Sequence, residues 1–127
     1  MNIIINNVLL RKNDIINKTM EYQELNTNNI PHNHSQEFLR LCDFFDSNFN
    51  EDEIMVIQSI MYFGRECFPD GRPECEGNVE ETIERWMKNL FFSCGERINK
   101  DIEISQMVEK GLKIGTYFKL AFEFFEK

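Results

Sequence analysis

Apolar residues recur every three or four positions through most of this 127-residue chain, and this spacing constrains its fold more than any other feature. It matches the α-helical repeat of about 3.6 residues per turn, so each such segment presents one apolar face. The most apolar segment is EDEIMVIQSIMYFGREC, residues 51–67. Asn50 and Glu53 stand where a capping box forms its two reciprocal bonds. We expect this helix at the centre of the core, with these residues facing inward: Ile54, Ile57, Ile60, Met61 and Phe63.

The remaining segments follow the same periodicity. Residues 1–25 have helical spacing, although the β-branched opening IIINNV also suits a short strand before the helix. An asparagine-rich loop follows at 26–35, and further helices are expected to begin after Ser35, Asn78, Asp101 and either Gly115 or Thr116. In residues 1–25 the positions expected on the inner face are Ile5, Val8, Leu9, Lys12, Ile16 and Met20. In the helix after Ser35 they are Phe38, Leu41, Cys42 and Phe45, and in the helix after Asn78 they are Val79, Ile83, Trp86, Leu90 and Phe91. In the last helix they are Tyr117, Leu120, Ala121, Phe124 and Phe125. The sequence therefore predicts an all-α, compact single domain over 1–127, a bundle of five or six helices with 36–127 as its helical core.

Length and composition suit a single domain that needs no metal or disulfide to fold. Hydrophobic residues make up 42% of the chain, and prolines and glycines are few. The opening MNIIINNVLLRKND lacks a basic start and a small-residue cleavage site, so we do not interpret it as a signal peptide. No apolar run reaches the length of a membrane span. We therefore expect a cytoplasmic protein whose four cysteines are free thiols.

Negative charge is concentrated in one part of the chain. The formal net charge is −8, which disfavours direct binding to nucleic acid. Residues 40–84 hold twelve carboxylates against three arginines, a balance of −9, and the rest of the chain is +1. Such a segment can be a solvated face that keeps the protein soluble. It can equally be a surface that attracts a basic partner.

Residues 46–57 partly match the calcium-binding loop of an EF-hand, but they lack two of its required residues. Asp46, Asn48 and Asn50 match the first three ligand positions of an EF-hand. The glycine required for its sharp turn is replaced by Glu51, and the position of the bidentate carboxylate holds Ile57. A helix cap explains the same residues better.

Zinc and thiol chemistry have few candidate residues. They are Cys42, Cys67, Cys75 and Cys94, with His32 and His34. Cys67 and Cys75 are eight positions apart, whereas structural zinc sites pair cysteines two to four residues apart. The histidines share one loop, which is a poor platform for the base of a cysteine nucleophile. With no motif for nucleophilic, phosphate or metal hydrolysis chemistry, we expect no enzyme, no cofactor and no metal.

The phenylalanines near the end of the chain exceed what one narrow helical face can cover. We expect most of them in the core. Phe92 and Phe122 are equally compatible with the core and with a partly exposed surface that pairs with a second copy or a partner.

Two segments resemble an uncharacterised bacterial family of small acidic helical proteins, a domain-of-unknown-function group. NEDEIMVIQSIMYFGRE, residues 50–66, is similar to a helix that begins NEDE and ends GR before an acidic loop and a tryptophan-bearing helix, here with Trp86. IGTYFKLAF, residues 114–122, is similar to a closing LGDYL helix. The resemblance covers at most 36–127, and the cysteine-bearing loop at 67–78 and the asparagine-rich start depart from it. It implies a helical fold, and it assigns neither a function nor a catalytic residue.

The function expected from these features is non-enzymatic protein binding by a small inhibitor or immunity-type protein. Its acidic surface would block the basic, nucleic-acid-binding face of a nuclease or defence effector, as an anti-CRISPR-like or toxin-neutralising protein does. The expected partner-binding residues are Phe68, Asp70, Glu74, Glu76, Glu80, Glu81 and Glu84. One alternative is a metal- or thiol-dependent site at Cys67 and Cys75, completed by Cys94 or His34. Another is a housekeeping helical subunit that dimerises through its C-terminal phenylalanines.

Overall fold

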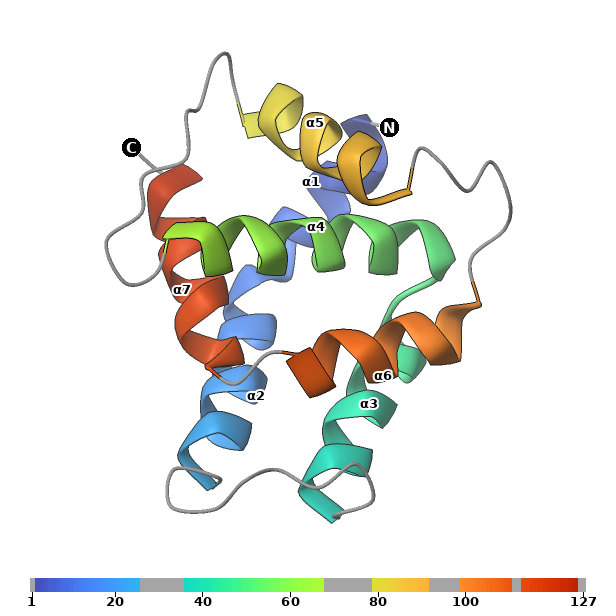
Figure 1. Cartoon of the computed structure of the whole chain (residues 1–127), viewed down its shortest axis with the longest axis vertical. Coiled ribbons are helices and arrows are strands. Elements are labelled where there is room, and N and C mark those ends of the chain that lie inside the picture. Colours follow the sequence, from blue (N-terminus) through green and yellow to red (C-terminus); the bar gives the residue numbers. More distant parts are fainter. Residues whose placement is uncertain (1, 26–35, 68–78, 92–98, 111–112, 126–127) are drawn as a thin grey trace.

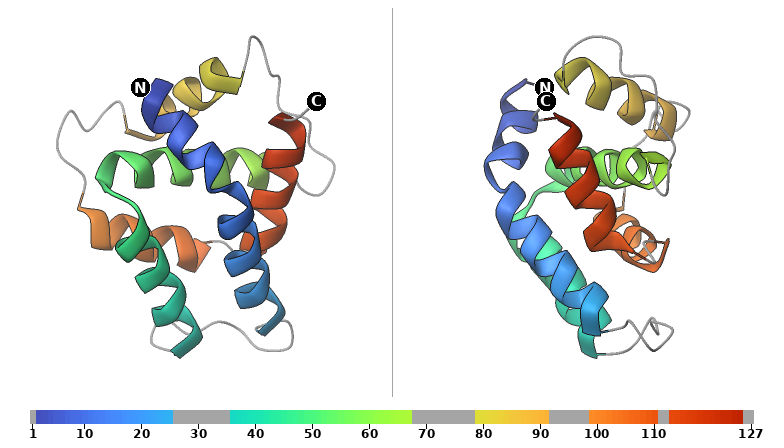
Figure 2. Two further views of the ribbon diagram at one scale, coloured as in Figure 1. Left: turned by 180° about the vertical axis from the view of Figure 1, so that it is seen from behind. Right: turned by 90° about the vertical axis from the view of Figure 1, so that its left-hand side faces the viewer.

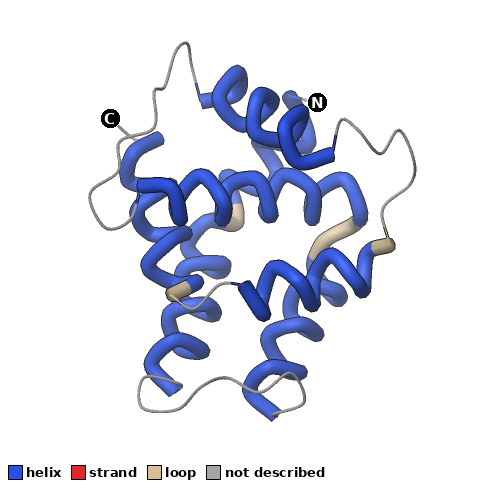
Figure 3. Tube along the Cα trace, viewed as in Figure 1, coloured by secondary structure: helices blue, strands red, loops and turns tan. Residues whose placement is uncertain are grey.

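The computed structural model describes residues 2–25, 36–67, 79–91, 99–110 and 113–125. These ranges are helical almost throughout and contain no strand (Figure 3). The helices are α1 (Asn2–Leu10), α2 (Lys12–Leu25), α3 (Gln36–Asn48), α4 (Glu51–Cys67), α5 (Val79–Phe91), α6 (Lys100–Lys110) and α7 (Ile114–Phe125). The all-α prediction is confirmed for the described residues, which form seven helices in place of the five or six expected. Within the described ranges, no helix combines the length and the apolar character needed to cross a bilayer.

Helix α4 lies at the centre and contacts four other helices, α1, α5, α6 and α7 (Figure 1). The inner face predicted for it is confirmed, because Ile54, Ile57, Ile60, Met61 and Phe63 are at most 1% exposed. The capping box is confirmed too. Glu53 N donates to Asn50 Oδ1 and Asn50 N donates to Glu53 Oε1, both at 2.9 Å.

The other helices enclose α4. Figure 1 shows α5 above it and α6 below it, while α7 crosses near its C-terminal end. Helix α7 also packs along α2, and α6 packs on α3. Helices α2 and α3 extend from this body as an antiparallel pair, as the views in Figure 2 also show. The core therefore lies around α4 and α7, and the α2–α3 pair projects from it.

The additional helix results from a break at Arg11, which divides the helix predicted at 1–25 into α1 and α2. The alternative of a short strand before the helix is wrong for residues 2–10, which are helical. The Arg11 N–H donates to the Val8 carbonyl three residues back at 2.9 Å, which tightens the turn between α1 and α2. Beyond the break the buried residues are Ile15, Thr19 and Tyr22, and the expected Ile16 and Met20 are only half-buried. The Thr19 hydroxyl donates to the Ile15 carbonyl at 2.7 Å, so its burial leaves no donor unmet.

Helices α6 and α7 begin earlier than predicted. Asn99, and not Asp101, caps α6 by accepting the N–H of Ile102 at 3.1 Å. Helix α7 starts at Ile114 and is covered on two sides, by α2 and α4, so it buries more than one narrow stripe. Phe118 and Phe122 are at most 2% exposed, which rules out Phe122 as a partner surface. Phe92 lies outside the described residues.

The expected inner faces of α3 and α5 are confirmed in part. Phe38, Leu41 and Phe45 are buried in α3, and Cys42 beside them is half-buried. In α5, Ile83 is buried as expected, whereas Val79 and Trp86 are half-buried. Thr82 and Met87 are buried residues of α5 that the predicted face omitted.

Two glycines let α7 approach its neighbours. A Cβ added to Gly64 in α4 would collide with the backbone carbonyl of Tyr117 in α7. A Cβ added to Gly115 in α7 would lie 2.6 Å from Cα and 2.7 Å from N of Met20 in α2. In both cases the obstruction includes backbone, which cannot move aside as a side chain would. The packing of α7 therefore requires glycine at both positions.

We expect Gly64→Ala and Gly115→Ala each to lower the free energy of unfolding by about 1–3 kcal/mol or more, the range for overpacking a close contact. The sign is informative, because Gly→Ala in an exposed helix stabilises by up to about 1 kcal/mol. Urea unfolding followed by circular dichroism measures the change. Gln106→Ala, at an exposed position of α6, is the control and should leave stability nearly unchanged. Stabilisation by either glycine variant would show that the close approach is not there.

Candidate functional site

The predicted partner-binding residues divide into two groups. Phe68, Asp70, Glu74 and Glu76 lie outside the described residues. Glu80, Glu81 and Glu84 lie on the first two turns of α5, where Glu81 and Glu84 are exposed and Glu80 is half-buried. Oxygen Oε1 of Glu80 is buried and accepts no hydrogen bond within the described part of the chain.

The exposed face of α5 is less acidic than the sequence count suggested. Arg85 and Lys88 are exposed one turn after Glu81 and Glu84, at the i,i+4 spacing that favours opposite charges. The acidic segment counted from residue 40 ends just before these two cations. Folding therefore places both signs on one helix face, with the carboxylates nearer its N-terminus.

A second acidic site, which the sequence analysis did not single out, is a hollow of about 220 Å³ between α3 and α6. We call it the α3–α6 hollow, and its lining residues are Leu39, Cys42, Asp43, Asp46, Asp101, Ile104 and Ser105. Three of these are aspartates, and they come from helices more than fifty residues apart in sequence. Leu39 is 53% exposed at its edge, and Ile104 is buried. The hollow thus combines an apolar base with carboxylates at its rim.

Lys100 links α6 to the end of α3 beside this hollow. Its Nζ donates to the backbone carbonyl of Asp46 at 2.7 Å and lies 3.3 Å from Oδ1 of the same residue. A cation at the last turn of a helix also interacts favourably with the helix dipole. Asp46 is therefore partly neutralised, whereas Asp43 and Asp101 are exposed and form no ion pair within the described residues.

The Cys42 thiol in the hollow is protonated at neutral pH. Burial raises its pKa from 9.0 to about 11, and a hydrogen bond with Ser105 opposes this shift. A protonated thiol is a poor nucleophile and a poor metal ligand. Cys42 therefore acts as a small apolar residue of the hollow, as its position beside Phe38 and Phe45 predicted.

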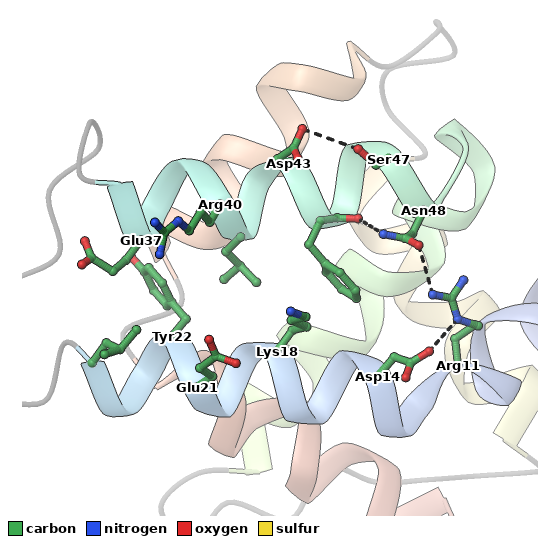
Figure 4. A pocket seen from close by; sticks show the side chains of 13 residues that line it. Arg11, Asp14, Lys18, Glu21, Tyr22, Glu37, Arg40, Asp43, Ser47 and Asn48 are labelled. Carbon is green, nitrogen blue, oxygen red and sulfur yellow. Dashed lines mark hydrogen bonds and ion pairs between the residues drawn. The ribbon is translucent and has the colours of Figure 1, made fainter.

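A larger cavity of about 560 Å³ lies between α2 and α3, and we call it the α2–α3 trough (Figure 4). Its lining includes buried Tyr22 and Leu41 and half-buried Phe44, whereas Lys18, Glu21 and Arg40 are exposed. The remaining lining residues are Arg11, Asp14, Leu25, Glu37, Asp43, Ser47 and Asn48. Burial, with Cys42 and Glu37 as lesser causes, raises the pKa of Tyr22 to about 12, so its phenol is neutral.

Arg11 closes one end of the trough. Its Nε donates to Asp14 Oδ2 at 2.9 Å, and its second guanidinium nitrogen donates to Asn48 Oδ1 at 3.2 Å (Figure 4). The guanidinium also lies 5.1 Å from the ring centroid of Phe49, a cation–π distance. One residue at the α1–α2 break thereby ties the start of α2 to the end of α3.

The proposed metal and thiol residues fall largely outside the described ranges. His32, His34, Cys75 and Cys94 are not described, and Cys67 is described only as the last residue of α4. Within the described ranges, no three histidine, cysteine, aspartate or glutamate side chains gather as metal ligands would. The alternative site at Cys67 and Cys75 therefore stays a prediction.

A scan against protein-family models, a search of curated proteins and a search of solved structures each returned no match. The resemblance to a family of small acidic helical proteins therefore stays a prediction.

We expect Cys42 to react slowly with a thiol-alkylating reagent when Cys67, Cys75 and Cys94 are replaced by serine. At neutral pH, a pKa raised from 9.0 to about 11 lowers the thiolate fraction about a hundredfold. A more basic thiolate is also a stronger nucleophile, which raises the rate of each thiolate about tenfold. The net alkylation rate should therefore fall about tenfold. The alkylation rate should keep rising as pH increases through 10 and reach half of its maximum near pH 11. A half-maximal rate near pH 9 would contradict the burial of this thiol.

Proposed function

We propose that this chain is a non-enzymatic protein-binding inhibitor, of the kind that acts as an immunity protein. Its acidic surface would cover the basic, nucleic-acid-binding face of a nuclease or defence effector, in an anti-CRISPR-like or toxin-neutralising role. The observation that supports this most directly is the α3–α6 hollow, where three aspartates surround a partly apolar depression. The first turns of α5, with Glu81 and Glu84 exposed, provide a second acidic area.

The hollow suits the side chain of a lysine or arginine. Such a side chain has an aliphatic stem that packs on apolar surface and a charged end that remains near carboxylates or water. The stem would contact Leu39 and Ile104, and the cation would lie between Asp43 and Asp101. Arginine is among the residues that contribute most to protein interfaces when its side chain fills a pocket.

Long-range charge would speed the encounter. The formal charge of −8 attracts a basic surface, and complementary charge raises association rates more than it raises affinity. A nuclease face that binds the phosphate backbone is rich in lysine and arginine for the same physical reason. Occupying that face would exclude nucleic acid without any chemical step.

The predicted surface at Phe68, Asp70, Glu74 and Glu76 belongs to the same proposal. It joins the C-terminal end of α4 to the start of α5 in the sequence, whereas the α3–α6 hollow lies at α3 and α6. Charge reversal at each location tests which of them contacts the partner.

The test is inhibition of purified basic nucleases, RNA-guided effectors included, by this chain. We expect the wild-type protein to slow cleavage in proportion to the complex formed, and Asp43→Lys to weaken binding at least tenfold, because an attraction becomes a repulsion at the hollow. Glu81→Lys with Glu84→Lys tests the α5 area in the same way. Association rates measured at several salt concentrations should fall as salt rises.

Glu123→Lys is the matched control, because it makes the same charge change at an exposed position of α7. It should retain inhibition, apart from a small loss of steering. If both acidic areas tolerate reversal while a nuclease is still inhibited, the contact lies elsewhere. If no nuclease in the panel is bound, the proposed function is wrong for that class of target.

A further inference from the structure

We propose that a second copy of this chain docks against α2, with the two α2 helices antiparallel, and covers the α2–α3 trough. This proposal is independent of the inhibitory function. It rests on the order of charges along α2, on the electrical neutrality of this part of the chain and on the apolar residues that the α2–α3 pair leaves accessible.

The charges that line the trough from α2 alternate in sign. Asp14, Lys18 and Glu21 are four and three positions apart, so they lie along one side of α2, and Arg11 at the break before α2 lines the trough three positions ahead of Asp14. The order is positive, negative, positive, negative. Figure 4 shows them in a row beneath α3.

This order is self-complementary about a two-fold axis. An axis through the point midway between Asp14 and Lys18 places Asp14 opposite Lys18 of the second copy, and Lys18 opposite Asp14. It also places Arg11 opposite Glu21 of the second copy, at the outer positions. A two-fold interface uses the same surface on both subunits, so a pattern of this kind is the requirement for it.

The parallel alternative is disfavoured by the same charges. Aligning the two α2 helices in one direction and in register sets Asp14 against Asp14 and Lys18 against Lys18. Like charges placed directly opposite each other are destabilising, so the pattern selects the antiparallel arrangement.

The N-terminal region is also electrically neutral overall. Residues 2–25 contain three basic residues (Arg11, Lys12, Lys18) and three acidic ones (Asp14, Glu21, Glu24), against −8 for the whole chain. A basic partner is attracted to the acidic surfaces, and a second acidic copy is excluded from them. The neutral face is left for self-association.

Apolar side chains supply contact area beside the charged row. Half-buried Phe44 and Leu25, which is 57% exposed at the end of α2, are the accessible apolar residues of the trough lining, whereas Tyr22 and Leu41 are buried. Because the lining of the trough includes exposed residues along both α2 and α3, a small ligand there would stay partly in water, unlike the ligands of most small-molecule sites. A helix lying along the trough covers it over its length.

Among the residues that line the α3–α6 hollow, only Asp43 also lines the trough that docking at α2 would cover. The residues of α3 that line the trough, such as Leu41 and Phe44, lie on a different side of that helix from Leu39 and Asp46, which line the hollow. Asp43 lies at the edge of both. Dimerisation and capture of a basic partner can therefore occur on the same molecule.

The test is a charge-swap mixing experiment by analytical ultracentrifugation over a wide range of protein concentration. We expect the wild-type chain to self-associate reversibly. Asp14→Lys and Lys18→Asp should each weaken self-association about tenfold, because two attractive pairs about the axis become repulsive. An equimolar mixture of these two variants should associate again. In the mixed pair, the lysine introduced into one variant faces the aspartate introduced into the other, and the unchanged Lys18 of the first faces the unchanged Asp14 of the second.

The mixture is what separates an interface from a change in folding, because a variant that merely unfolds is not restored by another variant. Glu109→Lys and Lys119→Asp make the same charge changes at exposed positions of α6 and α7 and should leave association unchanged.

Added salt is a poor probe here, because it screens both the paired charges and the net repulsion between acidic copies. A chain that stays monomeric at every concentration, or a mixture that fails to associate, would overturn the proposal, and the trough would then be open to a different occupant.

Discussion

The architecture depends on how closely α7 can approach α4 and α2. Gly64 lies against the backbone of Tyr117, and Gly115 lies against the backbone of Met20, so each of two helix pairs meets at a position without a side chain. The close approach lets Phe118, Ala121 and Phe122 be buried together on a helix of modest length. The same contact sets the direction of α2, because α2 packs along α7. The α2–α3 pair and the trough between these helices depend on that direction.

Long-range hydrogen bonds complete helix ends that local sequence leaves open. The Gln23 side chain in α2 accepts the N–H of Thr116 at 2.9 Å and donates to the Thr116 hydroxyl at 2.8 Å, which caps the start of α7 from ninety-three residues away. Lys100 completes the last turn of α3 in a corresponding way, through the Asp46 carbonyl. The capping box of Asn50 and Glu53 is local, and its spacing predicted it. The caps of α7 and of the end of α3 depend on tertiary packing, so no pattern near those positions indicated them.

The sequence predicted the fold class, the inner face of α4 and most of that of α3, because each of these depends on local periodicity. The loop predicted at 26–35 lies outside the described residues. The sequence misplaced the inner face at 12–25, because the break at Arg11 rotates α2 relative to α1, and Arg11 is held by Asn48 and Phe49 from elsewhere in the chain. The candidate site was predicted less well. Counting charges along the sequence grouped Glu80, Glu81 and Glu84 with the acidic segment and omitted Arg85 and Lys88, which share their helix face. The α3–α6 hollow joins Asp43 to Asp101, and such a pairing depends on the packing of α6 on α3.

The positions of several carboxylates also favour the helices that carry them. Several of them lie in the first turns of helices, as Glu51 and Asp52 do in α4 and Asp101 does in α6, where the positive end of the helix dipole favours negative charge. The charge that stabilises these helix starts remains exposed to solvent, so the same residues give the molecule its negative field. Asp43 has no such role in the fold, because it lies in the middle of α3 and, among the described residues, accepts only a 3.5 Å contact from Ser47. Asp43 therefore contributes little to folding, and it lines a hollow together with two further aspartates. Its loss should affect binding while leaving stability almost unchanged.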